Sequence, residues 1–215
     1  MSEKPLINIR ARSAAGKAAR RESILQAAES LFSANPTVLP TIAEISDACS
    51  LAKGTIYIYF PSKEAIFLTL LEESILKWTA EMRRTALEAK AAPAVLEVLC
   101  DHVNAHPRLM QLACLSNGVL EPNVSDDLLV HFKQTLCDDF HLTAREMRDL
   151  FPDQRQEQTI VQTLLQSYAL LIGLWQLAHP THSARGVESP TLETLRPPFE
   201  PTAREALNRL WGAAA

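Results

Sequence analysis

Apolar residues recur at spacings of three and four along most of the chain, and no alternating strand-like pattern persists. This period predicts amphipathic helices and therefore an all-α fold. The clearest apolar stripe lies in a helix expected over residues 16–33 and consists of Ile24, Ala27, Ala28, Leu31 and Phe32. Asn35-Pro36 follows, and because a proline disfavours helical backbone in the residue before it, the helix should end there.

Longer helices are expected beyond residue 61. One is expected over 62–90, with Ser62 as its N-cap. Others are expected over 93–105, 107–120, 125–150, 154–179 and 202–212, and the first two of these open at prolines. Residues 180–199 are rich in Pro, Ser and Thr and predict a long irregular loop. The first 15 residues are interpreted as a mobile basic arm.

Two short helices joined by a tight turn lie between the first helix and residue 62. The first is expected over 41–49, where Thr41 and Glu44 have the spacing of a capping box. Ser50-Leu51 makes the turn, and the second short helix is expected over 52–57. This arrangement is typical of a helix-turn-helix unit, whose second helix enters the major groove of DNA.

The second short helix and its surroundings carry side chains suited to DNA. Lys53, Gly54, Thr55 and Tyr57 are expected to face outward, and Gly54 lets the helix backbone come close to the floor of the groove. The hydroxyls of Tyr57 and Tyr59 can reach phosphate oxygens. Lys63 lies in the first turn of the next helix, where backbone N–H groups also point at a phosphate.

Charge is distributed unevenly along the chain. The 215 residues are 47% apolar and 21% charged, which is ordinary for a folded protein, and the net charge is −4. Residues 1–65 carry a net charge of +2, residues 66–215 carry −6, and the first 21 residues hold six basic groups against Glu3. A basic head on an acidic body indicates that only the head meets an anionic partner. A basic tail that merely solvates a flexible end would give the same balance.

Cysteine usage and the N-terminus favour a cytoplasmic protein. Cys49, Cys100, Cys114 and Cys137 are widely spread, so they form neither a disulfide framework nor a zinc-ribbon spacing. The N-terminus has no apolar signal segment, and the most apolar stretch, 164–178, is too short and too polar for a membrane span. No phosphate-loop, dinucleotide-binding or nucleophile-elbow motif is present, so we expect no cofactor, no metal and no enzymatic activity.

Residues 24–67 carry a family resemblance. They read ILQAAESLFSANPTVLPTIAEISDACSLAKGTIYIYFPSKEAIF, and this stretch resembles the DNA-binding domain of TetR/AcrR-family transcriptional regulators. The matching pieces are Ala-Ala-x-x-Leu-Phe, Thr-Ile-x-x-Ile, Lys-Gly-Thr-Ile-Tyr-x-Tyr-Phe and Ser-Lys-Glu. Two positions depart from the family pattern. Ser50 stands where glycine is usual, so left-handed backbone there carries a cost, and Ala52 replaces a Ser or Thr hydroxyl.

The resemblance implies two domains and a homodimer. Residues 1–61 would hold the basic arm and the helix-turn-helix domain, and residues 62–215 a helical ligand-binding and dimerisation domain. The two recognition helices of the dimer would enter successive major grooves of a pseudo-palindromic operator. The DNA contacts carried over are Thr41, Lys53, Gly54, Thr55, Tyr57, Tyr59 and Lys63. Thr41 could instead be only a helix cap, and Tyr59 only a core aromatic.

The resemblance also implies an inducer pocket enclosed by the helices over 62–179. A ligand there would favour the conformer that releases DNA. The apolar helices of this region favour an apolar or amphipathic inducer. The candidate wall residues are Trp78, Met82, Met110, Cys114, Asn117, Glu121, His131, Phe132, Tyr168 and Trp175. For the apolar members of this set, a place in an ordinary core is the stronger interpretation.

The last two helices usually form the dimer interface in this family. The interface residues expected on that basis are Ile160, Leu164, Leu171, Leu207, Leu210 and Trp211. The alternative is that these side chains close the core of a single chain.

Two other functions remain open beside a dimeric transcriptional repressor released by a small ligand. A ligand-binding or adaptor protein could keep the fold without specific DNA binding, although the complete segment 53–57 argues against this. A metal sensor could use His102 and His106, which lie one helical turn apart, but neither a third histidine nor an H-E-x-x-H order accompanies them.

Overall fold

The computed structural model describes residues 6–151, 156–180 and 193–212. Most of the loop expected over 180–199 and the helix start expected at 154 lie outside the described residues. Within the described ranges the chain is helical and has no strand, which confirms the predicted all-α fold.

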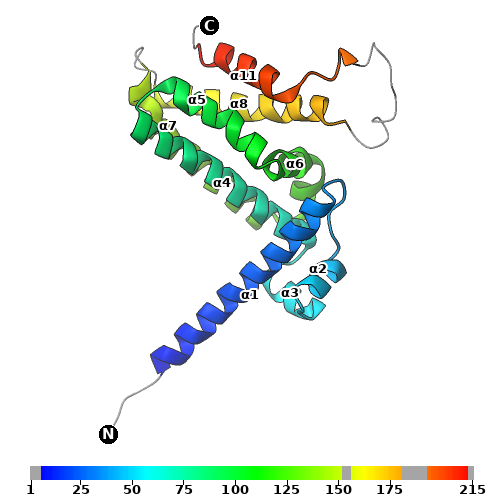
Figure 1. Ribbon diagram of the computed structural model, residues 1–215. Helices are drawn as coiled ribbons and strands as arrows, with labels where there is room; N and C mark the ends of the chain where they lie inside the picture. The colour runs from blue at the N-terminus through cyan, green and yellow to red at the C-terminus, as the bar shows by residue number, and fades with distance from the viewer. Residues whose placement is uncertain (1–5, 152–155, 181–192, 213–215) are drawn as a thin grey trace.

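The helices follow the predicted order (Figure 1). They are α1 (Leu6–Ala34), α2 (Ile42–Ala48), α3 (Lys53–Tyr59), α4 (Lys63–Ala89), α5 (Ala92–Ala105), α6 (Arg108–Leu115), α7 (Asp126–Met147), α8 (Glu157–Ala178) and α11 (Phe199–Leu210). Three short segments join them: the π-helical turn η1 (Ser116–Leu120) and the 3₁₀ turns η2 (Glu121–Asn123) and η3 (Arg148–Leu150).

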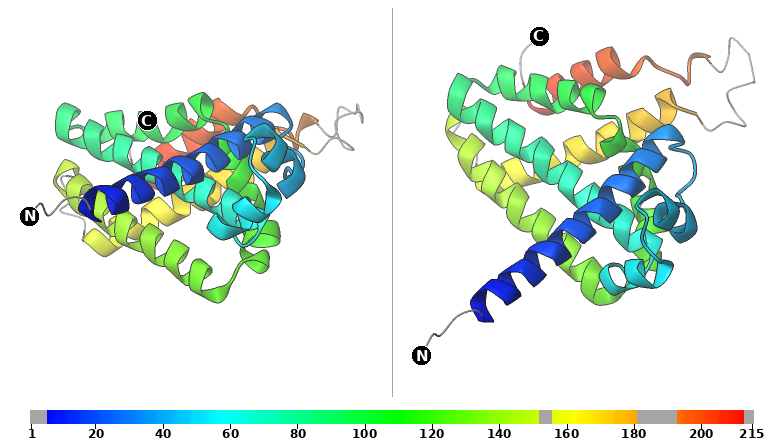
Figure 2. Two further views of the ribbon diagram at one scale, coloured as in Figure 1. Left: turned by 90° about the horizontal axis from the view of Figure 1, so that it is seen from below. Right: turned by 60° about the horizontal axis from the view of Figure 1, so that its bottom comes forward.

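The N-terminal segment differs from its prediction. α1 begins at Leu6, so most of the expected mobile arm is helical. From Leu6 onward the sequence LINIRARSAAGKAARR contains no proline and one glycine, and it is rich in Ala and Arg, which are strong helix formers. The N-terminal half of α1 extends beyond the other helices in Figure 1 and in the right-hand view of Figure 2.

The helix expected over 107–120 is also different. It ends as α6 at Leu115 and continues as the π-helical turn η1. Asn117 and Gly118 are poor helix formers, and Ser116 Oγ donates to Glu121 Oε1 at 2.8 Å across this turn. The chain therefore changes direction before α7, whose N-cap Ser125 accepts from the backbone of Leu128.

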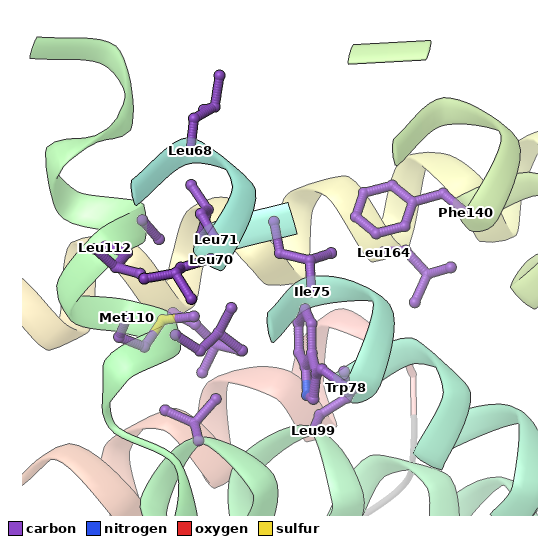
Figure 3. Close-up of a cluster of buried hydrophobic side chains, with 14 of the residues drawn as sticks. Leu68, Leu70, Leu71, Ile75, Trp78, Leu99, Met110, Leu112, Phe140 and Leu164 are labelled. Carbon is purple, nitrogen blue, oxygen red and sulfur yellow. The ribbon is translucent and has the colours of Figure 1, made fainter. Parts of the chain in front are cut away.

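α4 is the central helix of the molecule. It packs against α5 and α7 and also contacts α1 and α6. α8 packs against α7 and α11, and α11 also covers α5. Figure 3 shows the core that results, in which side chains of α4 meet those of four other helices. The labelled core residues are Leu68, Leu70, Leu71, Ile75, Trp78, Leu99, Met110, Leu112, Phe140 and Leu164.

A buried ion pair fixes α4 against α7. Arg83 Nη1 lies 2.7 Å from Asp139 Oδ1 and 2.8 Å from Thr143 Oγ1. Thr79 Oγ1 donates to the second carboxylate oxygen of Asp139 at 2.5 Å. The charge of Asp139 is thus compensated by a cation and a hydroxyl, as a buried carboxylate requires.

Candidate nucleic-acid interface

The capping box at the start of α2 is confirmed. Glu44 N–H donates to Thr41 Oγ1 at 3.2 Å, and the Glu44 carboxylate accepts from Thr41 N–H at 2.7 Å. The Thr41 hydroxyl also donates to that carboxylate, and these hydrogen bonds lower the pKa of Glu44. Thr41 is therefore a helix cap in this structure, and a phosphate contact by its exposed side remains a prediction.

The turn between α2 and α3 has the hydrogen bonds of a Schellman motif. Leu51 N–H donates to Ser46 O at 3.1 Å and Ser50 N–H to Asp47 O at 3.3 Å. Ser50 has φ 54°, the left-handed conformation expected from the departure at this position. The buried Ser46 hydroxyl donates back to Leu51 O, so Ser46 and Leu51 hold the turn from both sides. This turn sets the angle at which α3 leaves α2.

α3 is anchored by one buried side chain and presents its other face to solvent. Ile56 is fully buried, whereas Lys53, Gly54 and Tyr57 are exposed. Thr55 is half-buried, so it faces outward less than expected. The N-cap Ala52 provides no side-chain hydrogen bond, as its lack of a hydroxyl predicts.

The end of α3 packs into the core that α1, α2 and α3 share, which we call the helix-turn-helix unit (residues 6–61). Phe60 is buried, and the Arg21 guanidinium lies over its ring at 5.1 Å from the centroid. Tyr59 is half-buried and packs against this core, which favours the core alternative for its ring without excluding a contact by its hydroxyl. Lys63, in the first turn of α4, is half-buried with its ammonium 4.0 Å from Glu64.

Sequence reasoning missed Ile58. Its side chain is 78% exposed, the highest value among the exposed large hydrophobic residues of the described chain. Ile58 is four residues after Gly54 and next to Tyr57, so the three residues share the solvent face of α3. The helical spacing was the signal that could have identified it. Exposed apolar groups on a recognition helix can contact thymine methyl groups.

The predicted inducer residues do not form one group. Trp78, Met82, Met110 and Phe132 are buried in the core. The Trp78 and Tyr168 rings face each other with centroids 6.4 Å apart, and the half-buried Cys114 and Glu121 lie near Tyr168.

The other predicted inducer residues lie apart from Trp78 and Tyr168. Trp175 packs against His179 and Phe199 at ring distances of 3.8 and 5.1 Å. Asn117 and His131 are exposed. The geometry therefore brings together only the part of the predicted set around Trp78 and Tyr168, and an inducer pocket there remains a prediction.

The predicted dimer residues need a correction. Five of the six are buried within the single chain, namely Ile160, Leu164, Leu171, Leu207 and Trp211, and Leu210 is half-buried. Trp211 Nε1 donates to Ser167 Oγ at 2.9 Å, and its ring stacks on Phe151. These side chains close the monomer core between α8 and α11, because an amphipathic helix buries its most apolar stripe first.

His102 and His106 are arranged for contacts within the protein. Their rings are in tilted contact with centroids 4.5 Å apart, and His102 Nδ1 lies 2.5 Å from Glu81 Oε2. Burial lowers the pKa of His102. Among the described residues no group of three or more His, Cys, Asp or Glu side chains could hold a metal ion.

Two family models match the chain. The model described as "Bacterial regulatory proteins, tetR family" matches residues 24–70, which include α2, α3 and the first turns of α4. The model described as "Tetracyclin repressor-like, C-terminal domain" matches residues 72–212, which is most of the chain.

Individual relatives match over shorter stretches. The chain is 38% identical over 52 residues to the uncharacterized HTH-type transcriptional regulator YuxN of Bacillus subtilis (strain 168), covering 24% of this chain and 18% of that protein. It is 36% identical over 56 residues to the HTH-type transcriptional regulator EthR of Mycobacterium tuberculosis (strain ATCC 25618 / H37Rv), covering 26% of each. The chain thus spans about a fifth to a quarter of the length of these curated relatives.

One solved structure supports the fold over nearly the whole chain. The fatty acid degradation regulator FadR from Bacillus halodurans superposes with a TM-score of 0.59 at 15% sequence identity, covering 90% of this chain and 99% of that one. Together with the helix-turn-helix geometry and the two matching family models, this likeness shows that the chain belongs to the TetR family of transcriptional regulators.

Proposed function

We propose that the chain acts in the cytoplasm as a homodimeric repressor that reads a pseudo-palindromic operator with α3. The observation that carries this proposal is the solvent face of α3, where Lys53, Gly54, Tyr57 and Ile58 stand clear of the core while Ile56 anchors the helix. The ammonium of Lys53 and the phenol of Tyr57 suit contacts to phosphates. Gly54 allows the helix to come close to the floor of the groove, and Ile58 suits contacts to base edges.

The experiment is selection of bound duplexes from a random pool, followed by a salt titration of the winners. A dimer with two recognition helices should select two half-sites about 10 base pairs apart, or a multiple of that spacing. If Lys53 and Lys63 of both protomers neutralise four phosphates, the slope of log affinity against log salt is about −4. A steeper slope would indicate that basic residues in the N-terminal half of α1 also contact phosphates. If no duplex is enriched, the proposal is contradicted.

The exposed face of α8 supports the dimer. Only Glu157, its first residue, is charged, and one side of the helix is exposed in the single chain. α8 is long and apolar enough to cross a membrane, but in this structure one side of it packs against α7 and α11. Leu165, Ala169, Gly173 and Gln176 share one exposed face, and the two small residues allow a second helix to approach closely.

An interior donor supports the inducer. Trp78 is 1% exposed, and its Nε1–H has no hydrogen-bond partner among the described residues. A buried donor without an acceptor is costly, so a ligand with an acceptor near Trp78 and Tyr168 would be stabilised there. We infer an amphipathic inducer with an apolar body and a carbonyl or ether oxygen.

A thermal-shift screen of small amphipathic ketones and amides tests this site. Hits should raise the Tm of the wild-type protein and lower its DNA affinity. Trp78→Phe keeps an aromatic ring but removes the donor, so it should lose most of the shift. Hits that shift both proteins equally would place the ligand elsewhere.

A further inference from the structure

A cavity of about 510 Å³ lies where α1, α4, α5 and α6 meet. Its volume is within the usual range of small-molecule sites. In Figure 1 the C-terminal end of α1 lies beside α6, so the cavity is at the contact between the helix-turn-helix unit and the rest of the chain. The site proposed around Trp78 and Tyr168 contributes no residue to its wall. The charged and polar wall residues that carry the argument are Glu29, Lys77, His102, His106 and Arg108.

The wall carries more positive than negative charge. Lys77 and Arg108 face a single wall carboxylate, that of Glu29. Glu29 Oε1 contacts Arg108 Nη1, which joins α1 to α6. Lys77 is exposed, and no acidic side chain of the described chain pairs with its ammonium. The Arg108 side chain is 18% exposed, and burial lowers its pKa, so its charge is poorly solvated.

Two further features of the wall suit an anion with a ring or chain attached. The His102 side chain is 7% exposed, and its Nδ1 lies against Glu81 Oε2, so its ring is held in place at the wall of the cavity. The His102 and His106 rings lie in contact, with centroids 4.5 Å apart and planes tilted by 48°, and offer ring surfaces to the uncharged part of a ligand. α6 begins at Arg108 without a side-chain cap, so the N–H groups of its first turn favour negative charge beside the cavity.

We propose that this cavity binds a small organic anion, whose carboxylate or phosphate group lies between Lys77 and Arg108. Its uncharged part lies against the His102 and His106 rings. The anion replaces Glu29 as the partner of Arg108, so it contacts α1 and α6 at once. This site is a second one, distinct in place and in ligand charge from the inducer pocket.

Isothermal titration calorimetry of the full chain, without DNA, tests the site. The probes are phenylacetate, phenyl phosphate and the uncharged phenylacetamide. At least one anion should bind with a Kd below about 1 mM, and the amide should not. Tighter binding of phenyl phosphate assigns a phosphate ligand, and tighter binding of phenylacetate assigns a carboxylate. If neither anion binds at millimolar concentration, the proposal is wrong.

Three variants test where the anion binds. Lys77→Gln should weaken binding at least tenfold, and because Lys77 is exposed the variant should fold normally. Glu29→Gln should tighten binding several-fold, since it removes the carboxylate that competes for Arg108. Arg209→Gln on α11 removes one exposed charge away from the cavity and should change nothing. Equal binding by the wild-type, Lys77→Gln and Glu29→Gln proteins would overturn the site. Because no DNA is present, the outcome does not depend on operator binding.

Discussion

Ile58 gives α3 a side chain that can discriminate bases without a hydrogen bond. It is exposed on the same face as Gly54 and Tyr57, whereas Thr55 is half-buried. Ile58→Ala should therefore change the ranking of duplexes that differ at one base pair, by about 1 kcal/mol or more.

Lys63→Ala should weaken binding to all duplexes alike and make the salt slope shallower. Competitive selection with each variant measures both effects.

Leu87→Ala is the control for Ile58→Ala, because Leu87 is an exposed apolar residue on α4, 64% accessible. It should leave both affinity and ranking unchanged. The assignment of Ile58 to a base contact is refuted if its variant weakens every duplex by the same factor.

Ser50 provides a residue-level test of the turn. Its φ of 54° is left-handed backbone, which disfavours any residue with a Cβ atom. Ser50→Gly should raise the free energy of unfolding by about 0.5–1 kcal/mol, because the relief of strain exceeds the entropy that glycine adds to the unfolded chain.

Urea titration measures this change. Ala48→Gly, an exposed position in α2, is the matched control and should lower stability by about 1 kcal/mol. A loss of stability in Ser50→Gly would show that the turn is not strained.

At the scale of elements, local signals predict most helix starts but not how far the helices extend. The side chains of Thr41, Ser62 and Ser125 all cap helices. A cap of this kind forms between a side-chain oxygen and a backbone N–H three residues later, so it depends only on the local sequence. The start of α1 was missed, since a basic segment without an apolar stripe gives little periodic signal. The break at Leu115 depends on how η1 and Glu121 pack, which no local pattern specifies.

The ion pair between α4 and α7 is an element-level contact that the sequence also did not reveal. Arg83 and Asp139 are 56 residues apart, and each reads as an ordinary surface charge. Asp139→Ala leaves the partly buried Arg83 with only the more distant Glu146 carboxylate, 4.0 Å from its Nε, so it should lower the free energy of unfolding by about 3 kcal/mol.

Denaturant unfolding of Asp139→Ala, compared with Asp138→Ala at the neighbouring exposed position, checks this value. The double variant Arg83→Met, Asp139→Leu should recover much of the loss, because both charges are gone. Similar effects of Asp138→Ala and Asp139→Ala would contradict a structural role for the pair.

At the scale of the whole molecule, helical periodicity separates buried from exposed positions but does not say which surface meets a second chain. The stripe containing Leu164 and Leu171 was assigned to the dimer, yet the monomer uses it for its own core. The cavity beside Arg108 was missed for a related reason. Its wall comes from α1, α4 and the consecutive helices α5 and α6, so only the tertiary structure brings Glu29, Lys77 and Arg108 together.

The uncharged outer face of α8 is the surface that we assign to the dimer. Ala169→Glu would place a charge at the centre of that face and should raise the dimer dissociation constant at least tenfold. Sedimentation equilibrium measures this constant. Leu87→Glu, which adds the same charge at an exposed position of α4, should leave the dimer dissociation constant unchanged. If the dimer dissociation constant is unchanged in Ala169→Glu, the interface lies elsewhere on the molecule.

The central claim is that the solvent face of α3 reads a DNA sequence. The most direct test is fluorescence anisotropy with the selected palindrome and with a scrambled duplex of the same composition, at about 0.15 M salt. The account predicts an affinity at least about 10³ times higher for the palindrome. Affinities for the two duplexes that agree within a few-fold would contradict it, and would show that the basic surface binds DNA without reading it.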